Sequence, residues 1–162
     1  MFDELKNTCK YFNTNNLSYC ILRTPIDHVD GSEFEFDILI KDTQLKIFHH
    51  ILIEKGFVYS QDDIISHHHY RRGLLHLDIT VSLCYGDKRE YFVSLGHEVL
   101  DRAIFIDDMY FPDNMDEFTM LIFRCLFDKK SFKKYSDRII KLINIIGETK
   151  CMERMSSIFN LN

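Results

Sequence analysis

Two segments of the chain alternate apolar and polar side chains with a period of two, the pattern of a β-strand with one buried face. In residues 31–40 the apolar side chains share one face: Phe34, Phe36, Ile38 and Ile40. The acids of this segment occupy the other face: Glu33, Glu35 and Asp37. In residues 74–81 the polar face carries His76, Asp78 and Thr80. If the two strands are neighbours, Glu35, Asp37 and Asp78 converge on one side of one sheet.

Apolar residues at helical spacing predict helices before, between and after these strands. In chain order they cover residues 2–13, 43–55, 112–128 and 131–146, with a last amphipathic segment after Gly147. Gly56 is a typical end for the second of them. The apolar faces of the C-terminal helices are candidates for core packing, for a homodimer contact or for a partner protein.

Further strands are predicted at 17–23, 57–59 and 64–70, with Arg71-Arg72-Gly73 as a tight turn into a strand over 74–83. Residues 98–102 predict a helical turn, and residues 103–111 a small hairpin around Asp107-Asp108. The fold class is therefore α+β, a small mixed sheet with flanking helices followed by a C-terminal helical segment. We expect residues 1–162 to form one domain, with an α/β core in 1–88 and a mostly helical part in 89–162.

Composition narrows the class of protein. With 162 residues the chain is long enough to bury a core, and it contains no run of about 18 apolar residues that would predict a membrane span. The N-terminus lacks a basic region followed by an apolar one, so we expect a cytoplasmic protein. The five cysteines form no CxxC motif, which predicts reduced thiols and argues against a structural zinc knuckle. A net charge of −5 argues against general nucleic-acid binding.

The acids of the two strands indicate a cation site. Asp and Glu are disfavoured in strands, and like charges so close together repel unless a divalent cation or a base lies between them. Mg²⁺ takes oxygen ligands, usually one or two carboxylates together with substrate phosphates. Two acids two positions apart and a third on a neighbouring strand suit metal-assisted displacement at phosphorus. From spacing alone, a solvent-exposed acidic face in an acidic protein explains the pattern equally well.

The order of these segments resembles a known superfamily. Residues 19–24 form a strand and turn, Glu35-x-Asp37 follows after ten intervening residues, and Leu75-His76-Leu77-Asp78 supplies a third acid on a later strand. This order is similar to the nucleotidyltransferase superfamily, the polymerase-β-like minimal nucleotidyltransferase fold. More narrowly, the chain resembles a group of bacterial and archaeal nucleotidyltransferase-like proteins with "DIDILV"-like and "LHLDL"-like strands. The resemblance covers about residues 17–146.

The resemblance implies an activity and a set of ligands. A nucleotidyltransferase of this type moves an NMP from an NTP to a hydroxyl or phosphate acceptor and depends on Mg²⁺ or Mn²⁺. By the match of motifs, Glu35 and Asp37 would hold the metal, and Asp78 would act as third ligand or general base. Which NTP and which acceptor are used does not follow from the resemblance.

Phosphate contacts are expected from Arg23, Thr24 and Ser32, through a guanidinium and two hydroxyls. His76, on the acid face, would orient phosphate or take part in proton transfer, and a plain hydrogen-bonded sheet histidine is an equal interpretation. Arg23-Thr24 stands where the superfamily has a Gly-Ser turn. This replacement leaves two alternatives to catalysis: a catalytically silent nucleotidyltransferase-like binding or regulatory module, and a toxin–antitoxin component.

A run of three histidines lies between the two acidic strands. In a strand His67 and His69 share one face and His68 points away, so the three cannot all chelate one zinc ion. We interpret the run as a polar strand face beside the acids. A transition-metal site that also uses Asp62 and Asp63 is the less favoured interpretation.

Overall fold

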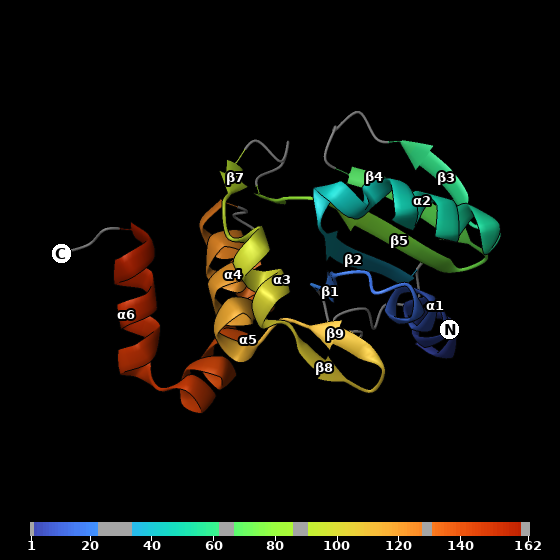
Figure 1. The fold of residues 1–162 in the computed structure, drawn as a ribbon. Helices are drawn as coiled ribbons and strands as arrows, with labels where there is room; N and C mark the ends of the chain where they lie inside the picture. Colours follow the sequence, from blue (N-terminus) through green and yellow to red (C-terminus); the bar gives the residue numbers. More distant parts are fainter. Residues whose placement is uncertain (1, 23–33, 62–66, 86–90, 128–130, 160–162) are drawn as a thin grey trace. The chain divides into compact units, whose positions relative to one another are not determined.

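The structure is a computed structural model that describes residues 2–22, 34–61, 67–85, 91–127 and 131–159 (Figure 1). The chain divides into two compact units. The sheet unit is Met1–Leu83 with Ser94–Phe111, and the helical unit is Cys84–Val93 with Pro112–Asn162. The predicted α+β class is confirmed, because the chain folds into a mixed sheet and helices. Among the described helices, none is both long and apolar enough to cross a membrane.

The sheet unit contains a five-stranded mixed sheet in the order β1-β2-β5-β4-β3. The strands are β1 (Tyr19–Ile21), β2 (Phe34–Ile40), β3 (Val58–Gln61), β4 (His67–Arg72) and β5 (Leu75–Thr80). The central pair, β2 and β5, runs parallel, whereas every other neighbouring pair runs antiparallel. In the parallel register Glu35 lies beside His76, and Asp37 lies beside Asp78. The two acidic strands are therefore neighbours, the condition under which their acids were expected to converge.

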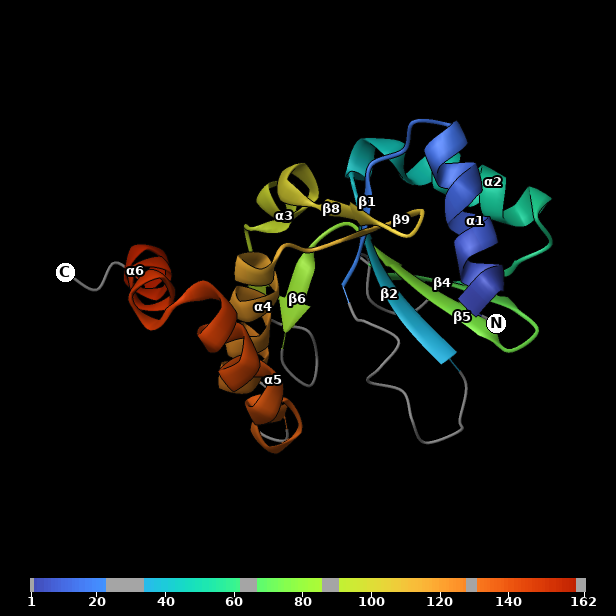
Figure 2. The ribbon, with the colours of Figure 1, turned by 90° about the horizontal axis from the view of Figure 1, so that it is seen from below.

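Two helices cover the apolar face of this sheet. They are α1 (Phe2–Thr14) and α2 (Leu45–Glu54), and a short 3₁₀ turn at Asp42–Gln44 precedes α2. Figure 2 shows α1 and α2 on the same side of the strands, and the Phe12 and Phe48 rings meet at 4.7 Å between their centroids. The core that they close contains the inward residues of the central strands: Phe36, Ile38, Leu75, Leu77 and Ile79. The opposite face of the central strands carries the acids and, near the end of β2, the buried Leu39.

The ends of the elements follow local chemistry. Gly56 takes a φ of +81° after α2, which glycine adopts without steric cost, so the predicted end of this helix is confirmed. The predicted turn at Arg71-Arg72-Gly73 is wrong, because Arg71 and Arg72 belong to β4 and the turn consists of Gly73 and Leu74. Arg72 therefore pairs with Leu75 across the hairpin, and this pairing decides which histidines reach the acids.

The strand predicted over 74–83 ends earlier, at Thr80. The Thr80 hydroxyl donates a hydrogen bond of 2.6 Å to the carbonyl of Ser82 and accepts one of 3.3 Å from the Ser82 amide. Such a local bond offers the backbone an alternative to the ladder, so the chain bends out of the sheet at this point. It continues into β6 (Leu83–Tyr85), which pairs with β7 (Tyr91–Val93).

A helix and a hairpin later in the chain complete the sheet unit. The helix is α3 (Gly96–Arg102), and the hairpin consists of β8 (Ile104–Ile106) and β9 (Met109–Phe111). Asp107 and Asp108 take φ values of +51° and +68°, the left-handed conformation of a two-residue hairpin turn, so the predicted hairpin is confirmed. The hairpin packs beside β1, where the rings of Tyr19 and Tyr110 meet edge to face at 5.4 Å. In α3, a Cβ added at Gly96 would lie 3.7 Å from the side chain of Leu39 on β2.

The helical unit consists of α4 (Asn114–Phe127), α5 (Ser131–Ile146) and α6 (Glu148–Phe159), together with β7. These are the helices that the apolar spacing predicts, and Gly147 separates the last two with a φ of +97°. Their shared core includes Phe118, Tyr135, Leu142 and Cys151. Each helix therefore buries one apolar stripe against its neighbours, the arrangement that amphipathic helices require.

Candidate functional site

Three carboxylates meet on the face of the sheet that α1 and α2 leave uncovered. Glu35 and Asp37 are two positions apart on β2, so their side chains share a face, and Asp78 stands beside Asp37 on β5. One oxygen atom of each carboxylate lies within 4.8 Å of an oxygen of each of the others. The convergence predicted from the alternation is confirmed. We call Glu35, Asp37 and Asp78 the acid triad.

Two members of the acid triad are buried. The exposed fraction is 2% for Asp78 and 9% for Asp37. A buried carboxylate is costly unless hydrogen bonds or a positive charge compensate for the lost water. The triad therefore needs a donor or a cation close by.

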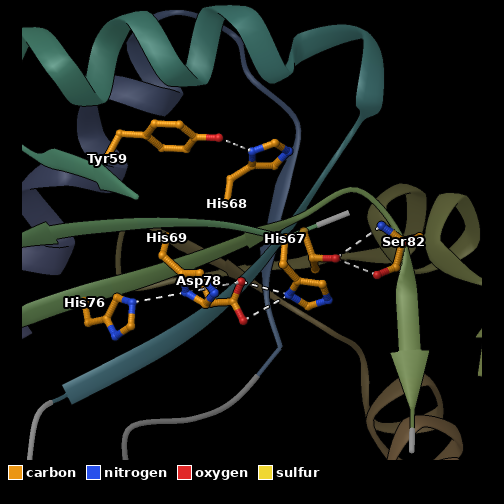
Figure 3. Close-up of polar contacts among 8 residues, drawn as sticks. Tyr59, His67, His68, His69, His76, Asp78 and Ser82 are labelled. Carbon is orange, nitrogen blue, oxygen red and sulfur yellow. Dashed lines mark hydrogen bonds and ion pairs between the residues drawn. The ribbon is translucent and has the colours of Figure 1, made fainter. Parts of the chain in front are cut away.

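His67 supplies a donor to Asp78. Its Nδ1 lies 2.9 Å from one carboxylate oxygen of Asp78 and 3.0 Å from the other, so the Nδ1–H bridges both (Figure 3). The Nε2 atom of the same ring is buried and has no hydrogen-bond partner among the residues that the structure describes. The described contacts thus hold the ring through its Nδ1 atom, which bonds to Asp78.

A second pair of histidines continues the polar face beyond Asp78. His69 stands opposite Asp78 on β4, and its Nδ1 lies 3.9 Å from a carboxylate oxygen of Asp78. The same Nδ1 lies 3.2 Å from Nε2 of His76, which is the neighbour of Glu35 in the sheet. Burial lowers the pKa of His76, and the nearby Glu35 carboxylate opposes this effect. The neutral imidazole, which can accept a hydrogen bond or bind a metal, is therefore the favoured form of His76 at neutral pH.

His68 lies on the face of the sheet opposite to that of His67 and His69, as the alternation predicted. Its Nδ1 is 2.9 Å from the hydroxyl of Tyr59, and both rings lie on the side of α2 in Figure 3. Burial lowers the pKa of His68, with a smaller contribution from the neighbouring His67. His68 is therefore part of the packing under α2, and of the three consecutive histidines it is His67 and His69 that face the acid triad.

Of the remaining predicted site residues, only His76 lies in the part of the chain that the structure describes. His76 lies beside the acid triad, as expected. Arg23, Thr24 and Ser32 lie outside the described residues, so their contacts with phosphate stay predictions. The same holds for Asp62 and Asp63, which the less favoured metal interpretation required.

The structure gives His67 and His69 a larger role than the sequence predicts. The sequence predicts a polar strand face for both, and nothing in their spacing indicates that His67 bonds to Asp78. The feature that determines which histidines face the acids is the length of the turn before β5. A two-residue turn at Gly73 and Leu74 sets His69 opposite Asp78, whereas a turn at residues 71–73 would have set His68 on the acid face instead.

The residues present fit a divalent cation. Three carboxylates whose oxygens lie close together offer the oxygen ligands that Mg²⁺ and Mn²⁺ prefer. A cation between them also relieves the repulsion among their negative charges. Arranged in this way, they can hold a metal against a polyphosphate and leave a carboxylate to accept a proton. This chemistry is that of phosphoryl or nucleotidyl transfer.

Comparison with known proteins supports the fold. No protein-family model matches the chain, and no curated protein matches its sequence. Among solved structures, the nucleotidyltransferase ANT(2″)-Ia in complex with adenylyl-2″-tobramycin is similar. The TM-score is 0.57 at 12% sequence identity, and the match covers 94% of this chain and 93% of that one. At this identity the similarity shows the fold, which is nucleotidyltransferase-like.

Proposed function

We propose that the protein is a metal-dependent nucleotidyltransferase that moves an NMP from an NTP to a hydroxyl or phosphate of an acceptor. The observation that carries this proposal is the acid triad, whose oxygens lie within 4.8 Å of one another. The triad is built on two adjacent strands of a nucleotidyltransferase-like fold. Either feature alone is common, and their combination favours catalysis at phosphorus over a solvated acidic surface.

In this proposal Glu35 and Asp37 hold Mg²⁺ or Mn²⁺ against the phosphates of the NTP. The bound ion would neutralise charge on the phosphates and on the leaving pyrophosphate. The proposal is supported by the position of both carboxylates on one face of β2. Strand-borne ligands are held more rigidly than loop-borne ones, which favours a fixed metal position.

Asp78 would take the proton of the acceptor. The acceptor oxygen forms a bond to the α-phosphorus as the bond from that phosphorus to the pyrophosphate breaks, and the acceptor proton passes to the Asp78 carboxylate. A carboxylate has about four lone-pair positions, so the bond from His67 leaves room for this proton. His67 would act as a positioning residue, because its Nδ1–H contacts both oxygens of Asp78 and fixes their orientation.

The structural neighbour suggests which acceptors to test first. The ANT(2″)-Ia structure contains adenylyl-2″-tobramycin, a nucleotide joined to an aminoglycoside. We therefore expect the acceptor of this protein to be a hydroxyl compound, and polyhydroxylated amines such as aminoglycosides form the first panel. Nucleotides and phosphorylated sugars form the second.

The direct test is transfer of an α-³²P label from each of the four NTPs to these panels, with Mg²⁺ and then Mn²⁺. Asp37→Asn should lower turnover by about 100-fold or more, because loss of a supporting contact at a metal site already costs 10–100-fold. Asp42→Asn, which changes an exposed acid outside the triad, should leave turnover unchanged. A folded protein that binds no NTP with either metal would rule the proposal out. Binding without any transfer would instead favour the catalytically silent module.

A further inference from the structure

A second group of ligand atoms lies beside the acid triad. Glu35, His69 and His76 each present one donor atom, a carboxylate oxygen or a ring nitrogen, and these atoms all lie within 4.8 Å of one another. The three residues come from three adjacent strands, β2, β4 and β5. All three side chains are half-buried, so the group is close to solvent, and each residue belongs to a strand of the sheet.

The spacing of the two imidazoles matches that of metal ligands. Nδ1 of His69 and Nε2 of His76 are 3.2 Å apart (Figure 3). In a tetrahedral site with zinc–nitrogen bonds of 2.0–2.1 Å, two ligand nitrogens lie about 3.3 Å from each other. The two nitrogens face one another, and Glu35 lies within reach as a third ligand without a change of strand register.

The donor set differs in kind from that of the acid triad. Carboxylates alone suit hard ions such as Mg²⁺, whereas imidazole nitrogens suit borderline ions such as Zn²⁺. Two histidines and one glutamate with a fourth position left open is a donor set that zinc enzymes use. This face of the sheet therefore carries two sets of ligands. The acid triad suits hard ions, the group of Glu35, His69 and His76 suits borderline ions, and Glu35 belongs to both.

We propose that Glu35, His69 and His76 form a second metal site that binds Zn²⁺ and leaves one coordination position open to solvent. The proposal does not depend on nucleotidyl transfer, since it rests on the imidazole pair and its shared carboxylate. The alternative explanation of the same geometry is a hydrogen bond between the two imidazoles. In that case a proton, and no metal ion, lies between Nδ1 of His69 and Nε2 of His76.

The test is metal binding by the full chain after removal of metals with a chelator. Calorimetric titration should show one tight Zn²⁺ per chain, and Co²⁺ as a probe should give the intense visible bands of a four-coordinate site. His69→Gln and His76→Gln should each weaken Zn²⁺ binding by more than about 10-fold, because each removes a direct ligand. His50→Ala is the matched control, since this histidine is exposed on α2 and its pair with Glu54 lies within the helix.

A readout on the unaltered protein covers the case in which a variant does not fold. X-ray absorption at the zinc edge should show two imidazole nitrogens and one carboxylate at bonding distance. Circular dichroism of each variant establishes that the sheet is intact. Equal Zn²⁺ affinity in the wild type and in a folded His69→Gln/His76→Gln double variant would overturn the proposal, as would absorption data that show no imidazole ligand.

Discussion

The Nδ1–H of His67 bonds to both carboxylate oxygens of Asp78, at 2.9 and 3.0 Å, across the β4–β5 hairpin. This contact compensates the most buried carboxylate of the acid triad with a donor from the adjacent strand. The exposed fraction of Asp78 is only 2%, so solvent contributes little to stabilising this carboxylate in the folded protein. The hairpin therefore does two things: it delivers Asp78 to the triad and supplies its partner.

His67→Ala should lower the free energy of unfolding by about 3 kcal/mol, because it removes a hydrogen-bond donor from a buried carboxylate. In the Asp78→Asn background the same change should cost clearly less, since the side chain at position 78 then carries no charge. Urea denaturation of the four proteins in this double-mutant cycle measures the coupling. Additive effects of the two single changes would contradict the structural role of this pair, and His50→Ala should change stability by less than about 0.5 kcal/mol.

Much of this face could be predicted from sequence, because alternation assigns each side chain of a strand to one side. That logic placed Glu35, Asp37 and Asp78 on polar faces and separated His68 from His67 and His69. Alternation does not determine register, however. A slip of two residues between β2 and β5 keeps every side chain on its face but moves Asp78 by about 7 Å along the strand, which would separate it from Asp37.

Turn length was the other quantity that pattern alone did not settle. Arg71, Arg72 and Gly73 all suit a turn, and the polar arginines gave no reason to extend the strand through them. In the structure Arg72 reaches back to Glu4 at 2.9 Å and to the Lys55 carbonyl at 2.7 Å, contacts with α1 and the end of α2 that keep it in β4. Such long-range contacts depend on the finished fold, so the pairing of His69 with Asp78 could not be derived from local spacing.

Phe12→Ala tests the packing of α1 and α2 on the apolar face of the sheet, opposite the acid triad. Phe12 is fully buried, and its ring lies 5.4 Å from that of Tyr19 and 4.7 Å from that of Phe48, between centroids. Replacing a buried phenylalanine by alanine costs about 3–5 kcal/mol, so we expect a loss of stability in this range. Urea denaturation measures it. Ile47→Ala, at a half-exposed position on α2, should cost less than about 1 kcal/mol, and equal losses for both variants would contradict the packing described.

Stability should fall at alkaline pH because of Cys9. Burial raises the pKa of the Cys9 thiol to about 12, against a hydrogen bond from Tyr19 that lowers it, while the thiol of the unfolded chain titrates near 9.0. Between these values the folded protein keeps a proton that the unfolded chain has lost. The free energy of unfolding should therefore drop by up to about 1.4 kcal/mol per pH unit from this group, and the contribution is fully present below pH 9.

The measurement is a series of urea denaturations from pH 8 to pH 11 for the wild type and for Cys9→Ala. The variant should show the shallower slope, because the buried thiol of Cys9 no longer contributes, although burial still raises the pKa of other groups such as Tyr19, Tyr70 and Cys151. Parallel slopes for the two proteins would show that Cys9 does not titrate differently in the folded state.

Glu35 separates the two metal proposals, because it alone belongs to both ligand sets. Glu35→Gln should abolish NTP turnover and also weaken Zn²⁺ binding, since an amide oxygen is a poorer ligand than a carboxylate. Asp37→Asn should lower turnover by about 100-fold or more but leave Zn²⁺ affinity within about threefold of the wild type, because Asp37 lies outside the set of His69, His76 and Glu35. Glu54→Gln on α2 controls for the loss of one acidic charge. If Asp37→Asn weakens Zn²⁺ binding as much as Glu35→Gln does, both ions occupy one shared site, and the separation of the two sets is wrong.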